Sequence, residues 1–360
     1  MPAVQSSPVP SSPGEADSLS APPPVFSEVD AAALARQHFG VEGTASKLTS
    51  ERDANFRIRT QGGESYVLKL SNPAEERLVT NLQTEALRHV AEKDPDLPVQ
   101  RVFRNAGGTY EEILSDAAGQ PLVLRLFSYL EGEPLHLAPR SAAQRRNLGS
   151  NLARLTRALA DFTHAATHHD LQWDIKHASR LWQLTPHVEA GEKRQLVERV
   201  LTNFDRQVTP VMADLRTQFV HNDLNPYNVL VDNQDPAKVA GILDFGDMVW
   251  TPLVNDLAVA SSYQLALEGD PLAEAGDLIA AYHGVLPLHE IELDLLYDLI
   301  AARLATTATI TSWRAARYPE NNDYILRNAP RAWAGLAAFA AMPREQAQEN
   351  LRRLCGLEVR

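Results

Sequence analysis

Segments with an apolar period of two dominate this chain before Gly132, and long helical periods dominate after it; no other feature of the sequence constrains the fold as strongly. Asn55–Arg59 and Ser65–Leu70 alternate apolar and polar residues on either side of a Gln61-Gly62-Gly63 turn, which is the pattern of a β-hairpin. Beyond Gly132, long stretches repeat apolar residues at about every third or fourth position. We therefore predict an α+β fold with two lobes: a small antiparallel sheet with one main helix, followed by a larger, mainly helical lobe.

Composition sets the boundaries of these lobes. The first residues are Pro, Ser and Ala with almost no bulky apolar side chains, so they cannot offset the entropy cost of folding. A capping box at Ser27 and Asp30 then opens a short helix, which Gly40 can close. The predicted segments are a disordered tail at residues 1–24, an N-lobe at 25–127, a hinge at 128–132 and a C-lobe at 133–360.

A lysine and a glutamate stand out in the N-lobe. The strand period places Tyr66, Leu68 and Leu70 on one face of the sheet and Lys69 on the opposite face. The Asn72-Pro73-Ala74-Glu75 sequence supplies an N-cap, a proline at the first helical position and a capping glutamate, so it predicts a helix through about Ala91 that carries Glu85.

The C-lobe contains the most informative motif, in which His221, Asp223 and Asn228 precede an apolar strand in a His-x-Asp-x4-Asn pattern. A second apolar strand then ends on Asp244, which is followed by Phe245 and Gly246. Phosphoryl transfer needs a carboxylate to orient the attacking hydroxyl and oxygen ligands for the magnesium on a triphosphate. Asp, Asn and Pro also form ordinary turns, but the second motif disfavours that alternative. We predict Asp223 as the base and Asn228 and Asp244 as Mg²⁺ ligands.

The same hypothesis assigns roles in the N-lobe. The order along the chain indicates that Lys69 binds phosphate and that Glu85 is its ion-pair partner. The chain has no Gly-x-Gly-x-x-Gly before this lysine and no P-loop motif, so the turn at residues 50–56 is expected to cover the phosphates. ATP and GTP stay equal candidates for the phosphoryl donor, because the geometry of the hinge selects the nucleobase. The predicted nucleotide-binding residues are Lys69, Glu85, Ser50, Asn55, Phe127 and Tyr129.

With these residues assembled, the chain resembles the aminoglycoside phosphotransferase and choline kinase superfamily, which has a two-lobed, protein-kinase-like fold. Its hydroxylysine kinase-like branch is the most similar, on the segments at residues 50–56, 171–174, 244–248 and 328–333. The resemblance implies a hydroxylated amine or amino acid as acceptor. It also implies the roles given above for Asp223, Asn228 and Asp244. The chain departs from the family at Asn222, where the small-molecule branch usually has glycine.

Carboxylates and aromatic faces of the protein suit a cationic amine of the acceptor. An arginine suits a carboxylate of the acceptor. Asp247 and Trp173 are candidates for binding the amine, but each has a structural alternative: Asp247 can cap a helix, and Trp173 can belong to the core. The candidates are Asp247, Trp173, Asp174, Arg303 and Arg314.

The formal charge of -12 disfavours nucleic acid and anionic membranes as partners, because a negative surface repels phosphate. The single cysteine, Cys355, excludes an intrachain disulfide and fits a reducing compartment, so we expect a cytoplasmic protein. The sequence leaves a homodimer open.

These observations predict a small-molecule kinase that transfers the γ-phosphoryl group of ATP or GTP to a hydroxyl of a hydroxylysine-like acceptor. An aminoglycoside or choline/ethanolamine-type phosphotransferase is the first alternative. A catalytically silent nucleotide-binding protein is the second, and the presence of Lys69, Asp223, Asn228 and Asp244 together argues against it.

Overall fold

The computed structural model of the protein describes residues 23–50, 52–116 and 119–358, and its chain divides into two compact units. The first unit runs to Arg88 and continues with Gln100–Tyr129, while the second comprises His89–Val99 and Leu130–Arg360. The second unit thus includes residues 89–99, which were expected in the N-lobe. Residues 1–22 of the predicted tail, and Glu51, lie outside the described part of the chain.

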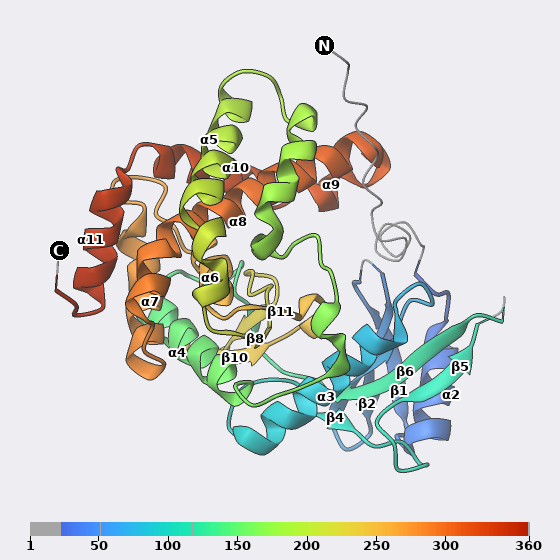
Figure 1. Ribbon diagram of the computed structural model, residues 1–360. Coiled ribbons are helices and arrows are strands. Elements are labelled where there is room, and N and C mark those ends of the chain that lie inside the picture. The colour runs from blue at the N-terminus through green and yellow to red at the C-terminus, as the bar shows by residue number, and fades with distance from the viewer. Residues whose placement is uncertain (1–22, 51, 117–118, 359–360) are drawn as a thin grey trace. The chain divides into compact units, whose positions relative to one another are not determined.

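The first unit is built on a six-stranded antiparallel sheet with the order β1-β2-β3-β6-β4, and β5 also pairs with β6 (Figure 1). Its elements are α2 (Glu28–Phe39), β1 (Gly43–Leu48), β2 (Ala54–Thr60), β3 (Ser65–Leu70), the first part of α3 (Arg77–Lys93), β4 (Val102–Phe103), β5 (Glu112–Ser115) and β6 (Pro121–Ser128).

One face of this sheet forms the apolar core of the first unit. Phe56, Leu68 and Leu126 are directly opposed on β2, β3 and β6, and all three are buried. Ala31 and Ala35 of α2 pack on the same cluster. The alternation of β3 therefore sends Lys69 to the other face, so the predicted hairpin and its two faces are confirmed.

The helix termini agree with the sequence at α2 and differ at α3. Ser27 and Asp30 form the predicted capping box, and Gly40 ends α2 in the left-handed conformation with φ 67°. The second helix begins at Arg77 and not near Pro73. The Asn72 Oδ1 atom accepts a hydrogen bond from the Ala74 amide, which closes a local turn before the helix starts.

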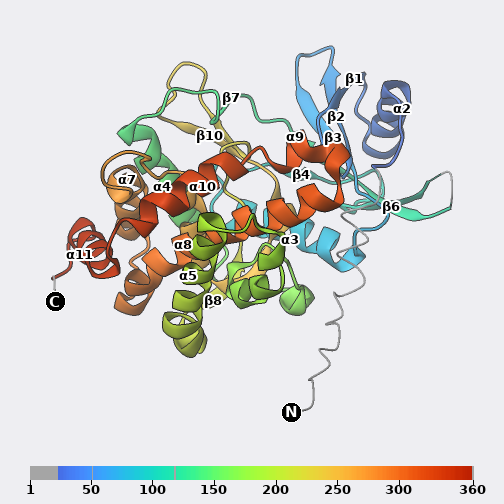
Figure 2. The ribbon, with the colours of Figure 1, turned by 90° about the horizontal axis from the view of Figure 1, so that it is seen from above.

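The second unit is mainly helical, with a three-stranded sheet of order β10-β9-β7 and a two-stranded pair of β11 and β8 (Figure 2). Its strands are β7 (Glu133–Pro134), β8 (Thr217–Val220), β9 (Val229–Val231), β10 (Val239–Ile242) and β11 (Val249–Pro252). Its helices are α4 (Ala142–Ala158), α5 (Glu192–Gln207), α6 (Val254–Ser262), α7 (Leu272–Val285), α8 (Glu290–Arg317), α9 (Asn322–Ile325), α10 (Ala329–Ala340) and α11 (Arg344–Leu354).

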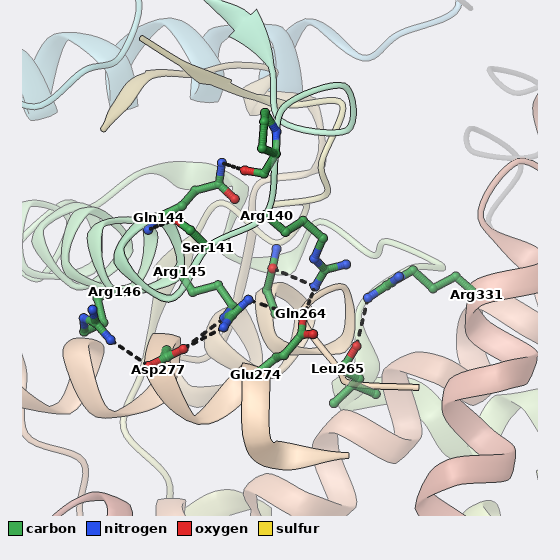
Figure 3. A network of polar contacts seen from close by, with 11 residues as sticks. Arg140, Ser141, Gln144, Arg145, Arg146, Gln264, Leu265, Glu274, Asp277 and Arg331 are labelled. Atoms are coloured by element: carbon green, nitrogen blue, oxygen red, sulfur yellow. Dashed lines mark hydrogen bonds and ion pairs between the residues drawn. The ribbon is translucent and has the colours of Figure 1, made fainter. Parts of the chain in front are cut away.

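The long helix α8 is the centre of the second unit, and α5, α6, α10 and α11 all pack against it. Beside it, α4 and α7 approach closely at Gly149, where a Cβ atom would lie 2.1 Å from the Leu278 carbonyl oxygen. Ion pairs from α4 to α7 hold the rest of this contact, with Arg145 and Arg146 each 2.9 Å from the Asp277 carboxylate (Figure 3). The α4–α7 contact is therefore held both by close backbone packing and by ion pairs.

The antiparallel sheet unit and the mainly helical unit confirm the predicted α+β class. Within the described ranges, no helix is both long and apolar enough to cross a membrane.

Candidate active site

The loop after β8 holds Asp223 by side-chain amides. Asn225 Nδ2 donates to Asp223 Oδ2 at 2.8 Å, and Asn228 Nδ2 donates to the same oxygen at 2.7 Å. The same Asn228 side-chain nitrogen, Nδ2, also donates to the Asp223 backbone carbonyl oxygen at 3.0 Å. The loop therefore fixes the rotamer of Asp223 and leaves Oδ1 in a different environment from Oδ2.

The backbone of this loop turns through a left-handed residue. Asn222 has φ 65°, and Asn is one of the few side chains that tolerates this region, which explains how it replaces glycine here. The buried carboxylate of Asp256 on α6 accepts the Asn222 amide at 2.8 Å and the His221 amide at 3.3 Å. Asp256 was missed in the sequence, although an acidic residue inside an otherwise apolar helix was a usable signal.

His221 connects the Asp223 loop to the strand that ends at Asp244. Its Nδ1 accepts the Asp223 amide at 3.2 Å, so the neutral tautomer with a proton on Nε2 can donate to the Leu243 carbonyl oxygen at 2.9 Å. Its ring also meets Phe245 edge to face, with the centroids 4.8 Å apart. Both motifs identified in the sequence therefore belong to one hydrogen-bonded assembly.

Asn228 and Asp244 lie at the same end of the β9–β10 hairpin. Val229 pairs with Ile242, and the Leu243 amide donates to the Asn228 carbonyl oxygen at 2.8 Å. The Asn228 side-chain nitrogen is used by Asp223, so its Oδ1 is the atom left for a ligand. Asp244 is exposed, and its Oδ1 accepts the Gly246 amide at 3.1 Å.

These donor atoms fit a hard divalent cation. Mg²⁺ prefers oxygen ligands and is commonly held by one or two carboxylates together with substrate phosphates. Among the described residues, no group of three or more His, Cys, Asp or Glu side chains is arranged to hold a metal.

The electrostatic environment of Asp223 favours proton uptake. Burial and the nearby negative charge of Asp247 raise the pKa of Asp223 to about 7, although Arg303 and the Asn225 hydrogen bond act in the opposite direction. Asp244 adds a smaller negative contribution. A carboxyl group with a pKa near neutrality can accept a proton from a hydroxyl and release it again.

Arg303 lies beside Asp223, and its contacts differ from those predicted for it. Its Nη2 atom is 3.4 Å from Asp223 Oδ1 and 3.3 Å from the Tyr263 hydroxyl, and its Nη1 donates to the Trp173 carbonyl oxygen at 3.2 Å. The side chain is only 3% exposed. Its two terminal nitrogens are therefore engaged by the protein, and its Nε is buried without a partner, which corrects the expectation that it binds a substrate carboxylate.

One more acceptor-site expectation is corrected. Asp174 is 1% exposed, and its carboxylate contacts Lys176 Nζ at 3.1 Å and Thr251 Oγ1 at 2.8 Å, so it is a structural group. Arg314 is buried and lies eleven residues beyond Arg303 on α8. The roles of Arg314, Asp247 and Trp173 stay predictions.

In the first unit, Lys69 and its carboxylate partner both belong to the sheet and its adjoining turn. Lys69 Nζ lies 2.8 Å from Asp53 Oδ2, and Asp53 Oδ1 accepts the Asn72 amide at 2.9 Å. Glu85 pairs with Arg88 on its own helix at 2.6 Å, so the prediction that Glu85 is the partner of Lys69 is corrected. Burial acts to raise the pKa of Asp53, but the charge and hydrogen bond of Lys69, the Asn72 amide and the charge of Arg125 together hold that pKa below its usual value.

A buried arginine that sequence reasoning missed lies next to Lys69. Arg125 on β6 is directly opposite Lys69 in the register, and Asn55 on β2 is opposite it on the other side, so the three share one face. Arg125 is 0% exposed. It donates to neutral acceptors at 3.0–3.4 Å, which are the Thr80 carbonyl oxygen and the side chains of Ser71, Gln83 and Thr84. An arginine within the apolar run of β6 was the available signal.

The other predicted nucleotide-binding residues belong to the same unit. Ser50 Oγ accepts the Asp53 amide at 3.2 Å, Phe127 is buried on β6, and Tyr129 lies under the Arg57 guanidinium at 3.9 Å from the ring centroid. Their roles toward a nucleotide stay predictions.

Comparisons with known proteins agree with this site. The phosphotransferase enzyme family (APH) matches residues 44–290. Hydroxylysine kinase of Mus musculus is 28% identical over 349 residues, covering 91% of this chain and 92% of the relative. Hydroxylysine kinase of Xenopus laevis is also 28% identical, over 347 residues, covering 91% of this chain and 93% of the relative.

Two solved structures share the fold. An amicoumacin kinase in complex with AMP-PNP, Ca²⁺ and Ami has a TM-score of 0.64 at 14% identity, covering 89% of this chain and 97% of that chain. A microcompartment-associated aminopropanol kinase has a TM-score of 0.64 at 18% identity, covering 92% and 100%. The predicted family resemblance and the prediction of a small-molecule kinase that acts on a hydroxyl are confirmed. This chain belongs to the phosphotransferase enzyme family.

Proposed function

We propose that this kinase transfers the γ-phosphoryl group of ATP or GTP to the hydroxyl of hydroxylysine or a closely related hydroxylated amino acid. The observation that carries the proposal is the Asp223, Asn228 and Asp244 assembly, in which a carboxyl group with a raised pKa lies beside two oxygen ligands. The acceptor class is supported by the hydroxylysine kinases that cover most of this chain.

In this proposal Asp223 orients the acceptor hydroxyl and accepts its proton through Oδ1, the oxygen that the loop amides do not use. Asn228 Oδ1 and Asp244 hold Mg²⁺, which when bound neutralises phosphate charge. Lys69, fixed by Asp53, binds the phosphates from the sheet. Asp247, whose charge acts on Asp223, attracts an ammonium group of the acceptor.

The test measures nucleotide turnover with Mg²⁺, separately for ATP and GTP, against hydroxylysine, choline, ethanolamine, aminopropanol, homoserine and an aminoglycoside. We expect turnover that depends on hydroxylysine and disappears in the Asp223→Asn variant. Turnover with an aminoglycoside or a simple amino alcohol, and none with hydroxylysine, would replace the proposed acceptor. Nucleotide binding without turnover of any acceptor would favour the silent alternative. Sedimentation of the same preparation decides whether it is a homodimer, and the cytoplasmic location stays a prediction.

A further inference from the structure

Arg327 is an exposed arginine that two tyrosines hold in place. It lies in the turn between α9 and α10, and its guanidinium carbon is 4.3 Å from the ring centroids of both Tyr227 and Tyr324. Stacking on two rings limits the rotamers of this long side chain before any ligand arrives. Arg327 therefore presents its charge at a fixed position.

That position adjoins the catalytic loop. Tyr227 directly precedes Asn228, and His136 stacks on the Tyr227 ring with the centroids 4.1 Å apart. His136 and Arg327 cannot both fit over one face of the ring at these distances, so they must occupy opposite faces. The Tyr227 amide is itself fixed by Asn225 Oδ1 at 2.8 Å. Arg327 is thus coupled to the loop that carries Asp223.

The donors of Arg327 are available to a ligand. Across the described residues, no carboxylate pairs with its guanidinium, and none of its side-chain nitrogens donates a hydrogen bond. Arg303, in contrast, is buried and engaged by Asp223 and Tyr263. An exposed, oriented guanidinium without an acid partner is suited to bind a planar anion with paired hydrogen bonds.

The charge of Arg327 also acts on Tyr263, which lies near Asp223 through Arg303. Burial raises the pKa of Tyr263, and the positive charges of Arg303 and Arg327 both act against this rise. The Tyr263 hydroxyl is the group that contacts Arg303, which in turn contacts Asp223. The two arginines therefore act on one region of the second unit, Arg303 from the interior and Arg327 from the surface.

We propose that Arg327 binds the carboxylate of the acceptor amino acid and so selects amino acids over simple amino alcohols. This inference rests on the proposed function, since it needs an acceptor with a carboxylate. Arg327 takes the role that sequence reasoning gave to Arg303, and the ammonium group remains with Asp247. Because the tyrosines fix the guanidinium beforehand, little side-chain entropy is lost on binding.

The experiment compares hydroxylysine with its decarboxylated diamine, which keeps the same hydroxyl and lacks the carboxylate. For Arg327→Gln we expect kcat/KM for hydroxylysine to fall about 10- to 100-fold, mainly through KM, because one charged hydrogen-bonded contact is lost. Turnover of the diamine should change less than about twofold, because this acceptor never used the contact. Arg327→Lys keeps the charge without the planar fork and should give an intermediate loss for hydroxylysine alone.

Arg317 supplies a matched control. It is also an exposed arginine beside two rings, at 6.0 Å from the Trp313 centroid and 5.8 Å from the Tyr318 centroid, but it lies at the end of α8. Arg317→Gln should leave both acceptors unchanged. An equal loss for hydroxylysine and the diamine in Arg327→Gln, or no loss for either, would overturn the inference and leave the proposed function intact. Failure of the unmodified protein to use hydroxylysine would overturn the proposed function, and this inference with it.

Discussion

The two units of this kinase gather opposite charges by different means. In the first unit, the sheet register sets Lys69 beside the buried Arg125, and Asp53 is the carboxylate that contacts the lysine. Strand pairing fixes these positions, because directly opposed residues must share a face. In the proposed reaction this cationic face of the sheet suits the phosphates of a nucleotide.

In the second unit the arrangement is reversed. Asp223, Asp244 and Asp247 lie close enough for the latter two to raise the pKa of the first, and Arg303 is the cation that offsets them. No continuous strand carries these aspartates. Two residues with positive φ, Asn222 and Asp244, and the side-chain amides of the loop set their positions. This anionic surface suits a metal ion and a cationic acceptor.

The comparison shows that the charged groups of the two units differ in how well they tolerate the loss of a neighbouring contact. A cation fixed by sheet register has its place secured by many backbone hydrogen bonds, so a lost neighbour weakens its orientation without removing it. An aspartate held in a loop by a few side-chain bonds depends on each of them. We therefore expect the loss of Asp223 in the second unit to lower turnover more steeply than any single loss in the first.

The largest effect is expected at Asp223. Asp223→Asn preserves the size of the side chain but removes the proton acceptor, so kcat should fall about 100- to 10,000-fold while nucleotide affinity stays nearly constant. Acceptor-dependent nucleoside diphosphate release gives kcat, and a fluorescent nucleotide gives affinity. A loss of less than about tenfold would mean that Asp223 does not act as the base.

A smaller effect is expected at Asp53 in the first unit. Asp53→Asn removes the charged contact to Lys69, and kcat/KM for the nucleotide should fall about 10- to 100-fold. The double variant with Lys69→Met should lose little more than Lys69→Met alone, because Asp53 acts through the lysine. Initial rates at varied nucleotide concentration measure both.

Glu85 is the matched control for Asp53, since its carboxylate is partly exposed and pairs with Arg88 on the same helix. Glu85→Gln should change nucleotide kcat/KM less than about twofold, in line with the small energy of exposed ion pairs. Equal losses in Asp53→Asn and Glu85→Gln would return the role of lysine partner to the helix glutamate.

Arg303 should give the next effect in size. Arg303→Lys keeps a positive charge but cannot span Asp223, Tyr263 and the Trp173 carbonyl oxygen at once, so kcat should fall about tenfold. KM for hydroxylysine should change little, because Arg303 is engaged by the protein and not by the acceptor. A rise in KM with unchanged kcat would instead restore the original prediction of a substrate contact.

These residues also mark what the sequence could predict. Local patterns were sufficient for the β2–β3 hairpin, for the face of Lys69 and for the capping box at Ser27, because each depends on spacing within a few residues. The Asp223, Asn228 and Asp244 assembly was predicted for the same reason, since a short loop and a hairpin bring these residues together.

Contacts between distant segments were not accessible in this way. Asp53 and Glu85 are equally acidic in the sequence, and only the folded sheet and its turn bring the first of them to Lys69. Asp174 was expected to bind the acceptor, yet tertiary packing buries it against Thr251. Arg327 attracted no attention because its meaning depends on Tyr227, a hundred residues earlier in the chain.

The smallest effect is expected at Asn222, and it tests the loop itself. Asn222→Gly removes a buried side chain whose amide nitrogen and oxygen have no partner, and glycine readily adopts φ 65°. The entropy cost of the added glycine, about 0.5–1 kcal/mol, opposes the relief of these polar atoms. Turnover should therefore stay within about twofold of the unmodified protein, as the glycine usual in this family also implies.

Asn222→Ala is the comparison that makes this prediction informative. Alanine also removes the unpartnered amide, but its Cβ disfavours the left-handed region by about 1–2 kcal/mol. The loop must then strain or lose its hydrogen bonds to Asp256, and because Asp223 is the next residue, kcat should fall together with the thermal midpoint. If Asn222→Ala matches Asn222→Gly in both measurements, the backbone conformation at this residue does not set the position of Asp223. The contrast between a tolerant sheet and a sensitive loop would then have to rest on the side-chain amides of Asn225 and Asn228 alone.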